Sequence, residues 1–303
     1  MTSISVFQQK LKERLPGAML KFEEPLSAHT SFRVGGPAEV MAFPDSRDAL
    51  AELLKTSSLL NVKPIILGAG TNVLAPDRGI DGLVICLKDC LDGIEIVGET
   101  CVRVMGGVTM SRAAIFAANH GLSGMEFAHG IPGTVGGGVY MNAGAYGGEI
   151  CQICREVEVM NLDGEIRTYA AEEMMFSYRH SILEDTGGIV VSALFELTKG
   201  DPEEIRGKMK ELMAKRSASQ PLELPSAGSA FKRPVGGFAA ALIDQSGLKG
   251  FQVGGAGISV KHAGFAVNLG GATAEDVKEL LKRVSDIVFE KHGIRLQPEI
   301  RIW

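Results

Sequence analysis

The chain has 303 residues, of which 45% are hydrophobic and 22% are charged. This size and composition are typical of a globular protein with two or three domains, and they exclude a disordered or fibrous chain. The net charge of -5 argues against a general nucleic-acid binder, because no broad basic surface would drive counterion release. We therefore expect any anionic ligand to bind at a local cluster of basic residues.

Neither the N-terminus nor the cysteines point to export. The first 20 residues lack a continuous apolar core and a small-residue cleavage site, so we expect no signal peptide, and no stretch approaches the length of a membrane span. An odd number of cysteines without an export signal favours free thiols and a cytoplasmic location. Cys151 and Cys154 form a CxxC pair, but no second pair completes a metal site. The five cysteines are Cys86, Cys90, Cys101, Cys151 and Cys154.

The first region, residues 1–82, is expected to form a small β-α-β unit. Apolar residues recur with helical spacing over Ser46–Leu60, after the apolar run Ala38–Phe43. The following "KPIILGAGTNVL" predicts a strand and a glycine turn.

The second region, residues 83–200, is rich in short β-like runs and is expected to be a mixed α+β domain. A helix is predicted in "SRAAIFAANHG". Strands are predicted in "LVICL", "GIEIVG", "CVRVMGG", "EVEVM", "EIRTYA" and "GIVVSALFEL".

The third region, residues 201–303, is expected to be a smaller α/β domain. Asp201 and Pro202 are typical of the first residues of a helix, which predicts a connecting helix in "DPEEIRGKMKELMAKRSA". Two further helices are predicted in "GGFAAALIDQSGL" and "TAEDVKELLKRVSDIVFEKHG". Short strands are predicted in "GISV", "GFAVNL" and the terminal "LQPEIRIW".

Two glycine loops stand out from this pattern. "LGAGTNVL" resembles the start of a dinucleotide-binding loop, but Val73 occupies the third glycine position and no clear helix follows. Alone, it could be an ordinary turn at a strand end. A denser tract runs from Gly130 to Gly148 in the next region. Because glycines let backbone N–H groups approach oxyanions, the two loops together favour a bound dinucleotide.

Six motifs in one order carry a family resemblance over roughly Ser27 to Ile302. They are "HTSFRVGGPA", "ILGAGTNVL", "GLSGMEFAHGIPGTVGGGVYMNAGAYGGEI", "FSYRHSIL", "SAGSAFKRP" and "LQPEIRI". The chain resembles the UDP-N-acetylenolpyruvoylglucosamine reductases, also called UDP-N-acetylmuramate dehydrogenases, of bacterial peptidoglycan synthesis. The chain after "YRHS" lacks an inserted loop and is therefore similar to the shorter, type II branch.

The resemblance implies an α+β fold, in which a two-part FAD-binding region of the vanillyl-alcohol-oxidase type precedes an α/β substrate domain. It implies non-covalent FAD with NADPH as the reductant. Neither glycine loop contains a histidine to which the flavin could be covalently attached, although His129 adjoins one of them. This agrees with non-covalent binding. The cofactor-binding residues that we expect are Gly68, Ala69, Gly70, Thr71, Asn72, Gly130, Ile131, Pro132, Gly133, Thr134, Gly136, Gly137 and Gly138.

The implied reaction moves a hydride from reduced flavin to the terminal methylene of an enolpyruvyl ether, which leaves negative charge on the carbon beside the carboxylate. Arg179 and Glu299 match the family's residues for stabilising this charge, and Ser229 matches its proton donor. A serine hydroxyl is a weak acid, so a nearby cation has to support it, and Lys232 is a candidate. Taken alone, these residues could equally be a surface arginine, an edge-strand carboxylate and a turn serine.

Further substrate contacts are expected on the basis of the same resemblance and of local charge. Each of these residues could instead serve packing or solvation alone. The basic residues flank the "GSAF" turn, where they could attract the anionic sugar nucleotide. The expected residues are Tyr140, Tyr146, Lys232, Arg233, His262 and Phe265.

Two other functions are compatible with parts of this pattern. An oxidase on the same flavin fold would turn over with oxygen and often carries covalently attached flavin. A non-catalytic nucleotide-binding protein would have lost one of Arg179, Ser229 or Glu299, and all three are present. The sequence therefore favours the reductase, with a UDP-sugar substrate and without nucleic acid, a membrane span or an obligate protein partner.

Overall fold

A computed structural model describes residues 6–303, which form two compact units. Unit 1 comprises the chain up to Phe22, Glu39–Ala69 and Gly82–Lys215, and unit 2 comprises Glu23–Ala38, Gly70–Asp81 and Arg216–Trp303. The expected three-part division at residues 82 and 200 stays a prediction. The two units do not follow those boundaries, because each is built from several separate stretches of the chain. The chain passes from one unit to the other within the strands β1 (Leu20–Pro25), β2 (Pro37–Ala42) and β5 (Ile80–Cys86).

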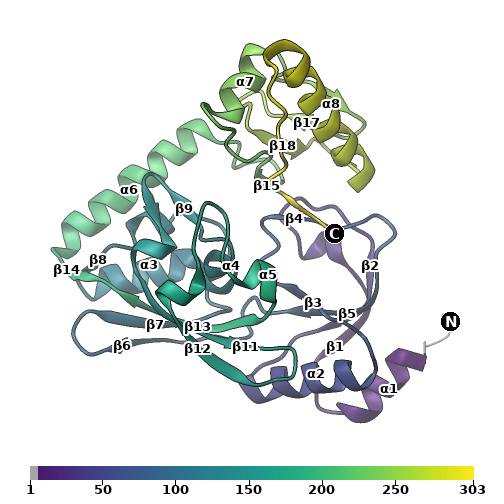
Figure 1. Cartoon of the computed structure of the whole chain (residues 1–303), viewed down its shortest axis with the longest axis vertical. Coiled ribbons are helices and arrows are strands. Elements are labelled where there is room, and N and C mark those ends of the chain that lie inside the picture. Colours follow the sequence, from purple (N-terminus) through teal and green to yellow (C-terminus); the bar gives the residue numbers. More distant parts are fainter. Residues whose placement is uncertain (1–5) are drawn as a thin grey trace. The chain divides into compact units, whose positions relative to one another are not determined.

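The centre of unit 1 is a five-stranded antiparallel sheet in the order β12-β11-β13-β7-β6 (Figure 1). Its middle strand is buried from Ile189 to Phe195, since neighbouring elements cover both faces. Register is fixed by pairs such as Val157 with Ala193 and Ser192 with Met105. All five strands fall where the sequence predicts them: β6 (Ile94–Val97), β7 (Cys101–Met105), β11 (Cys154–Met160), β12 (Ile166–Ala170) and β13 (Ile189–Glu196).

Capping side chains define where the helices of unit 1 begin. Thr109 accepts a hydrogen bond from Arg112 N at 3.3 Å at the start of α3 (Met110–Asn119). The Asp201 carboxylate accepts from Glu203 N at 2.8 Å at the start of α6 (Pro202–Ser219), which confirms the predicted cap.

The glycine tract differs from the sequence prediction of an open loop. It contains a short helix, α4 (Val135–Tyr140), which packs on β13 and β7 (Figure 1). Glycine is a weak helix former, so tertiary packing has to stabilise this turn. The fully buried Val135 and Val139 provide that packing, and the Thr134 hydroxyl caps the helix by accepting from Gly137 N.

A second core of unit 1 forms around the N-terminal elements. Helix α2 (Arg47–Leu59) begins at the Ser46 cap and buries Leu50, Leu53 and Leu54. These leucines pack with Leu11 of α1 (Val6–Arg14) and Ile85 of β5. Strand β5 belongs to a four-stranded sheet in the order β1-β2-β5-β3 and pairs in parallel with β3 (Ile65–Leu67). The predicted strand–helix–strand pattern is thereby confirmed.

Unit 2 is built on a four-stranded antiparallel sheet in the order β15-β18-β17-β16, with α7 and α8 beside it (Figure 1). Helix α8 packs on β16, β17 and α7, and its N-terminus donates backbone hydrogen bonds to the Asp77 carboxylate. The predicted C-terminal strand is shorter than expected, because only Arg301–Ile302 (β19) pairs with β4 (Val73–Leu74). The other elements are α7 (Ala239–Gln245), α8 (Ala274–His292), β15 (Ser226–Ser229), β16 (Gln252–Val253), β17 (Ala256–Ile258) and β18 (Phe265–Asn268).

Short elements complete the described chain, in which we find no helix that combines the length and apolar character of a membrane span. They are β8 (Leu122–Ser123), β9 (Gly144–Ala145), β10 (Gly148–Glu149), β14 (Thr198–Lys199), α5 (Leu183–Thr186) and the 3-10 turns η1 (Leu26–Ala28), η2 (Glu126–Ala128), η3 (Ile150–Gln152) and η4 (Ala171–Met174).

Candidate functional site

The two glycine loops meet within unit 1. A Cβ atom added to Gly68 would lie 2.7 Å from the Thr134 Oγ1 atom, closer than real Cβ contacts. Ala69 continues the first loop, and Gly130, Ile131, Pro132 and Gly133 lead to Thr134 in the second. Two loops that the sequence separates by about 60 residues therefore present adjacent backbone, as a shared dinucleotide site would require.

Much of the backbone in the second loop is already bonded within the protein. The amides of Val135, Gly136 and Gly138 donate to the carbonyls of Val108, Gly106 and Thr134 at 2.7, 2.8 and 2.8 Å. A Cβ atom on Gly136 would lie 3.0 Å from Gly106 O, and one on Gly138 would lie 2.8 Å from Met110 Sδ. Internal packing thus explains some of these glycines without a ligand.

Gly137 is different, because a Cβ atom there would meet only Thr134 Oγ1 at an ordinary 3.5 Å and the residue is exposed. The protein alone does not require a glycine at this position. The predicted loop residues contain no carboxylate and most are partly exposed, so they fit the diphosphate of an FAD.

The rest of the first loop, Gly70 to Asn72, belongs to unit 2. Gly70 has a φ of +64°, and a Cβ atom there would lie 2.1 Å from His29 O. Only glycine fits this conformation and this close approach. Thr71 and Asn72 follow, and the Asn72 carbonyl accepts a hydrogen bond from Arg301 N at 2.9 Å.

Ser229 lies at the exposed end of β15, where the strand is irregular. Ser226 pairs with Val267 and Ser229 pairs with Phe265, with a register shift between them. Gly228 provides the positive φ of 76° that this bulge contains. Bulges re-aim side chains at functional sites, and here the bulge ends at the predicted proton donor.

Glu299 lies on the segment that pairs with the residues after Ser229. Its N–H donates to Ala230 O at 2.9 Å, and Lys232 N donates to Gln297 O at 2.8 Å. The Glu299 side chain is buried, with 9% of its surface exposed. Unit 2 therefore brings Ser229, Glu299 and the Asn72 end of the first glycine loop together, and the Asn72 Nδ2–Glu299 O distance is 3.4 Å.

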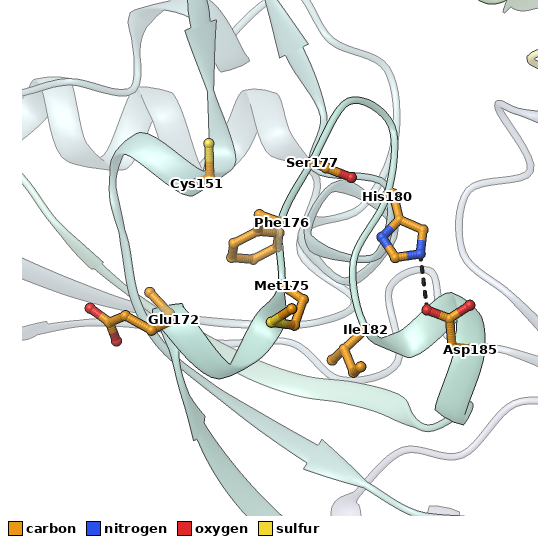
Figure 2. A pocket seen from close by; sticks show the side chains of 9 residues that line it. Cys151, Glu172, Met175, Phe176, Ser177, His180, Ile182 and Asp185 are labelled. Atoms are coloured by element: carbon orange, nitrogen blue, oxygen red, sulfur yellow. Dashed lines mark hydrogen bonds and ion pairs between the residues drawn. The ribbon is translucent and has the colours of Figure 1, made fainter.

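Arg179 belongs to unit 1 and lies on a tight turn between Ser177 and His180, whose backbones pair. Its φ of 56° is unusual for a side chain with a Cβ atom. The Arg179 Nη2 atom donates to Gly144 O at 3.3 Å, and the guanidinium lies 5.0 Å from the Tyr178 ring centre. Figure 2 shows Ser177 and His180 beside a shallow hollow, with His180 Nε2 3.1 Å from Asp185 Oδ2.

The two predicted tyrosines also lie in unit 1. Tyr140 is partly buried against the main core, and its carbonyl accepts a hydrogen bond from Ser181 Oγ at 2.8 Å. Tyr146 is 46% exposed and has a φ of 54°. Its exposure leaves Tyr146 more accessible to a ligand than Tyr140.

The remaining predicted substrate contacts lie in unit 2. The His262 ring packs edge-on against Phe265 at 5.0 Å, and Gly264 N donates to its Nδ1 atom at 3.1 Å. Burial lowers the pKa of His262, and the charge of Lys249 lowers it further. His262 is therefore neutral near pH 7. Phe265 is buried and pairs with Ser229, the predicted proton donor, in the sheet.

Two basic residues follow Ser229. Lys232 is half-buried, and the Arg233 guanidinium lies 4.5 Å from the Phe238 ring centre. Both remain predicted substrate contacts. Stacking on the Phe238 ring restricts the positions that the Arg233 guanidinium can occupy.

Burial favours the thiol form of four cysteines. It raises the pKa of Cys154 to about 12 and that of Cys90 to about 11, and it also raises the pKa values of Cys86 and Cys151. In the described part of the chain, no cluster of three His, Cys, Asp or Glu side chains could hold a metal ion.

Ser31 and Asn142 are two further residues of the site region for which the sequence predicts no role. Ser31 N donates to Gly70 O at 3.0 Å and Ser31 Oγ donates to Ser226 O at 2.6 Å, so this residue joins the first glycine loop to β15. Asn142 is 1% exposed and contacts the Arg179 turn. Ser31 lies in "HTSFRVGGPA" and Asn142 in the glycine tract, so their place in the family motifs was the available signal.

Two family models match the chain. A model described as "FAD binding domain" matches residues 38–170, and one described as "UDP-N-acetylenolpyruvoylglucosamine reductase, C-terminal domain" matches residues 220–303. These matches confirm the expected fold class, in which an FAD-binding region precedes a smaller α/β domain.

Curated relatives match nearly the whole chain. UDP-N-acetylenolpyruvoylglucosamine reductase from Latilactobacillus sakei subsp. sakei (strain 23K) is 46% identical and covers 93% of each chain. The protein of that name from Caldanaerobacter subterraneus subsp. tengcongensis is 44% identical over 98% of each chain.

Solved structures agree with these relatives. The crystal structure of UDP-N-acetylenolpyruvylglucosamine reductase (MurB) from Thermus caldophilus matches with a TM-score of 0.80, 37% identity and coverage of 94% of this chain and 98% of that one. Alkyldihydroxyacetonephosphate synthase shares the fold alone, with a TM-score of 0.50 and 16% identity over 64% of this chain and 41% of that one. With relatives this similar over their full length, the chain belongs to the UDP-N-acetylenolpyruvoylglucosamine reductase family.

Proposed function

We propose that this protein is an FAD-containing oxidoreductase that reduces UDP-N-acetylglucosamine enolpyruvate to UDP-N-acetylmuramate with NADPH in bacterial peptidoglycan synthesis. Family membership and the FAD-binding-domain match support the cofactor and the reaction. We further propose that it works in the cytoplasm.

The glycine loops are the parts of the chain suited to hold the cofactor. Within unit 1, the backbone of Gly68 and Ala69 is proposed to contact the cofactor together with residues 130–138. Gly70, Thr71 and Asn72 of unit 2 stay predicted cofactor-binding residues. When bound, FAD would supply hydride transfer from NADPH to the enolpyruvyl double bond. Because neither glycine loop contains a histidine for covalent attachment, we propose that FAD binds non-covalently.

Ser229 is the proposed proton donor. Its hydroxyl is exposed at the end of a strand whose backbone is fixed by pairing with β18, so it can reach a ligand without disturbing the core. Protonation of the substrate carbon beside the carboxylate completes the reduction. The amine of Lys232, three residues further on, can lower the cost of leaving negative charge on the serine oxygen.

Arg179 and Glu299 are the proposed stabilising groups. The Arg179 guanidinium carries the positive charge suited to an enolate-like carboxyl group. Glu299 is buried, and a bare carboxylate would repel the developing negative charge. Its proposed role is therefore to hydrogen-bond the substrate or to orient a cation toward that charge.

The observation that carries this proposal is the pairing of residues 230–232 with residues 297–299. It brings Ser229 and Glu299 onto neighbouring segments within the domain that matches the reductase C-terminal model. Exposed Ser229 and buried Glu299 thus lie on neighbouring backbone segments, which supports a shared role in proton delivery and charge stabilisation.

The test is turnover by the purified protein. With NADPH and UDP-N-acetylglucosamine enolpyruvate, we expect NADPH absorbance to fall in step with the appearance of UDP-N-acetylmuramate, measured by mass spectrometry. NADPH consumption that needs oxygen and yields no muramate product would instead indicate an oxidase. Denaturation and filtration should release yellow FAD into the filtrate, whereas colour retained on the precipitated chain would show covalent attachment.

A further inference from the structure

The turn that carries Arg179 has an unfavourable backbone that something has to stabilise. Arg179 itself has a φ of 56°, and a positive φ in a non-glycine residue typically raises the energy unless surrounding contacts fix it. Within the turn, Ser177 N donates to His180 O at 3.1 Å and His180 N donates to Ser177 O at 3.2 Å. These two bonds close the turn but do not attach it to the rest of unit 1.

Asn142 provides such an attachment. Its Nδ2 atom donates to Ser177 O at 3.0 Å and lies 3.3 Å from Glu149 Oε2, while its Oδ1 atom accepts from Cys151 N at 2.9 Å. The side chain thus links the Arg179 turn to the segment 149–151, which directly follows the glycine tract. Cys151 and Ser177 line the same hollow in Figure 2.

The chemistry of this position favours asparagine over other residues. Asn142 has a φ of 43° and is 1% exposed, and asparagine tolerates the left-handed region better than most residues. Only an amide offers an acceptor for Cys151 N together with donors for Ser177 O and Glu149. Because buried polar groups without partners are destabilising, these contacts fix one arrangement of the turn.

The same tract also contacts the Arg179 side chain. Arg179 Nη2 donates to Gly144 O, two residues after Asn142, and Ser181 Oγ donates to Tyr140 O, two residues before it. The turn and the tract are therefore held together at several points around Asn142, so that Asn142 is in a position to set where the guanidinium lies.

We propose that Asn142 is a positioning residue for Arg179: its amide holds the Ser177–His180 turn against the glycine tract so that the guanidinium is already placed when substrate arrives. This inference rests on the proposed function, because it assumes that Arg179 stabilises charge on the enolpyruvyl substrate. Preorganised charge is effective since no reorganisation is needed during the reaction.

The main test variant is Asn142→Gly, because glycine accepts the positive φ and isolates the loss of the side chain. Anaerobic stopped-flow measures reduction of the enzyme by NADPH and its reoxidation by the enolpyruvyl substrate as separate rates. We expect reoxidation to slow about tenfold or more, as small misplacements of a catalytic group do, with reduction changed less than about twofold. Hydrogen exchange should accelerate in a peptide spanning residues 174–183.

The control for general destabilisation is Ser192→Ala. Ser192 is fully buried in β13 of the same unit and bonds to Glu158, away from the proposed chemistry. We expect this variant to lower the melting temperature while leaving exchange in residues 174–183 and both rates close to those of the unaltered protein.

A double-mutant cycle with Arg179→Ala decides whether Asn142 acts through Arg179. If it does, adding Asn142→Gly to Arg179→Ala slows reoxidation by less than about twofold more, because the two losses are not independent. Fully additive losses, or equal losses in both half-reactions, would overturn the inference while leaving the proposed function intact. Unaltered reoxidation in Arg179→Ala would instead remove the proposed role of Arg179, and turnover absent from the unaltered protein would remove the proposed function itself.

Discussion

Unit 1 and unit 2 hold their expected site residues in opposite ways. In unit 1, the Arg179 turn and the glycine tract are tied together by buried side chains and by amides that donate within the protein. In unit 2, Ser229 lies exposed after a bulge, and backbone pairing with β18 fixes its main chain. Changes at the packed positions of unit 1 should therefore disturb structure together with function, whereas Ser229 can be altered with little effect on folding.

Ser229→Ala should have the largest effect of these variants on the rate of reoxidation, and the effect should be confined to that step. Loss of a positioned proton donor typically slows its step by about 10²–10⁴-fold, and we expect that loss in reoxidation by the enolpyruvyl substrate. NADPH should still bleach the flavin at a nearly unchanged rate, because reduction does not use this proton. Anaerobic stopped-flow at the flavin absorbance separates the two rates. Blocked reduction with intact reoxidation would show that Ser229 is not the donor.

Removing a charge-stabilising group should have the next largest effect. Glu299→Ala and Arg179→Ala are each expected to slow reoxidation by about 10²–10³-fold, the range found when one donor to a developing anion is removed. Only Arg179→Ala should also raise the KM for the enolpyruvyl substrate, since a cation attracts its carboxylate before reaction. Steady-state KM and kcat for both variants check this, and a KM rise in Glu299→Ala alone would reverse the assignment.

Gly136 and Gly137 distinguish packing from cofactor binding within unit 1. Gly136→Val places a Cβ atom 3.0 Å from Gly106 O, and we expect it to lower the free energy of unfolding by about 1–3 kcal/mol, as overpacking does. FAD affinity should fall with it. Thermal unfolding and FAD titration measure the two effects.

The matched variant Gly137→Val adds the same side chain where only Thr134 Oγ1 lies near, at 3.5 Å. We expect folding of the apoprotein to be nearly unaffected and FAD affinity to fall sharply, since only a ligand would occupy that space. Normal FAD affinity in Gly137→Val would show that this turn does not face the cofactor.

The smallest effect is expected from His262 in unit 2. Burial holds its pKa below the ordinary 6.5, so below that pH the unfolded chain binds more protons than the folded one, and stability falls as the pH is lowered. His262→Gln should remove that contribution, so that the melting temperature of the variant falls less between pH 7.5 and 5.5. An identical fall in both proteins would show that other groups dominate.

The fold was largely predictable, because its helices and strands carry clear local signals. The helix expected over Ser46–Leu60, the Asp201 cap and the strands of the five-stranded sheet are confirmed where the sequence predicts them. The helix α4 was missed, since its glycines disfavour a helix and only burial of Val135 and Val139 stabilises it. No local pattern reveals such tertiary packing.

The site was predictable only through the family motifs, and its supporting contacts were not. Ser229 and Glu299 lie 70 positions apart, and nothing in their spacing indicates that Ala230 O accepts from Glu299 N. The positive φ of Arg179 and the Ser31 bonds to Gly70 and Ser226 are likewise invisible in the sequence. These features depend on residues brought together from distant parts of the chain.

The discontinuous make-up of unit 2 has a consequence for how the protein folds. Residues 23–38 and 70–81 are synthesised early, but their partners lie in residues 216–303, and β4 pairs with β19 at the very end of the chain. Contacts with such large sequence separation slow folding, because a long loop has to close before they form. All three segments of unit 1 have been synthesised once residue 215 is reached, whereas on the ribosome unit 2 has to wait for the last residues. A nascent chain arrested near residue 290 should therefore protect unit 1 from protease and leave the first glycine loop open to cleavage.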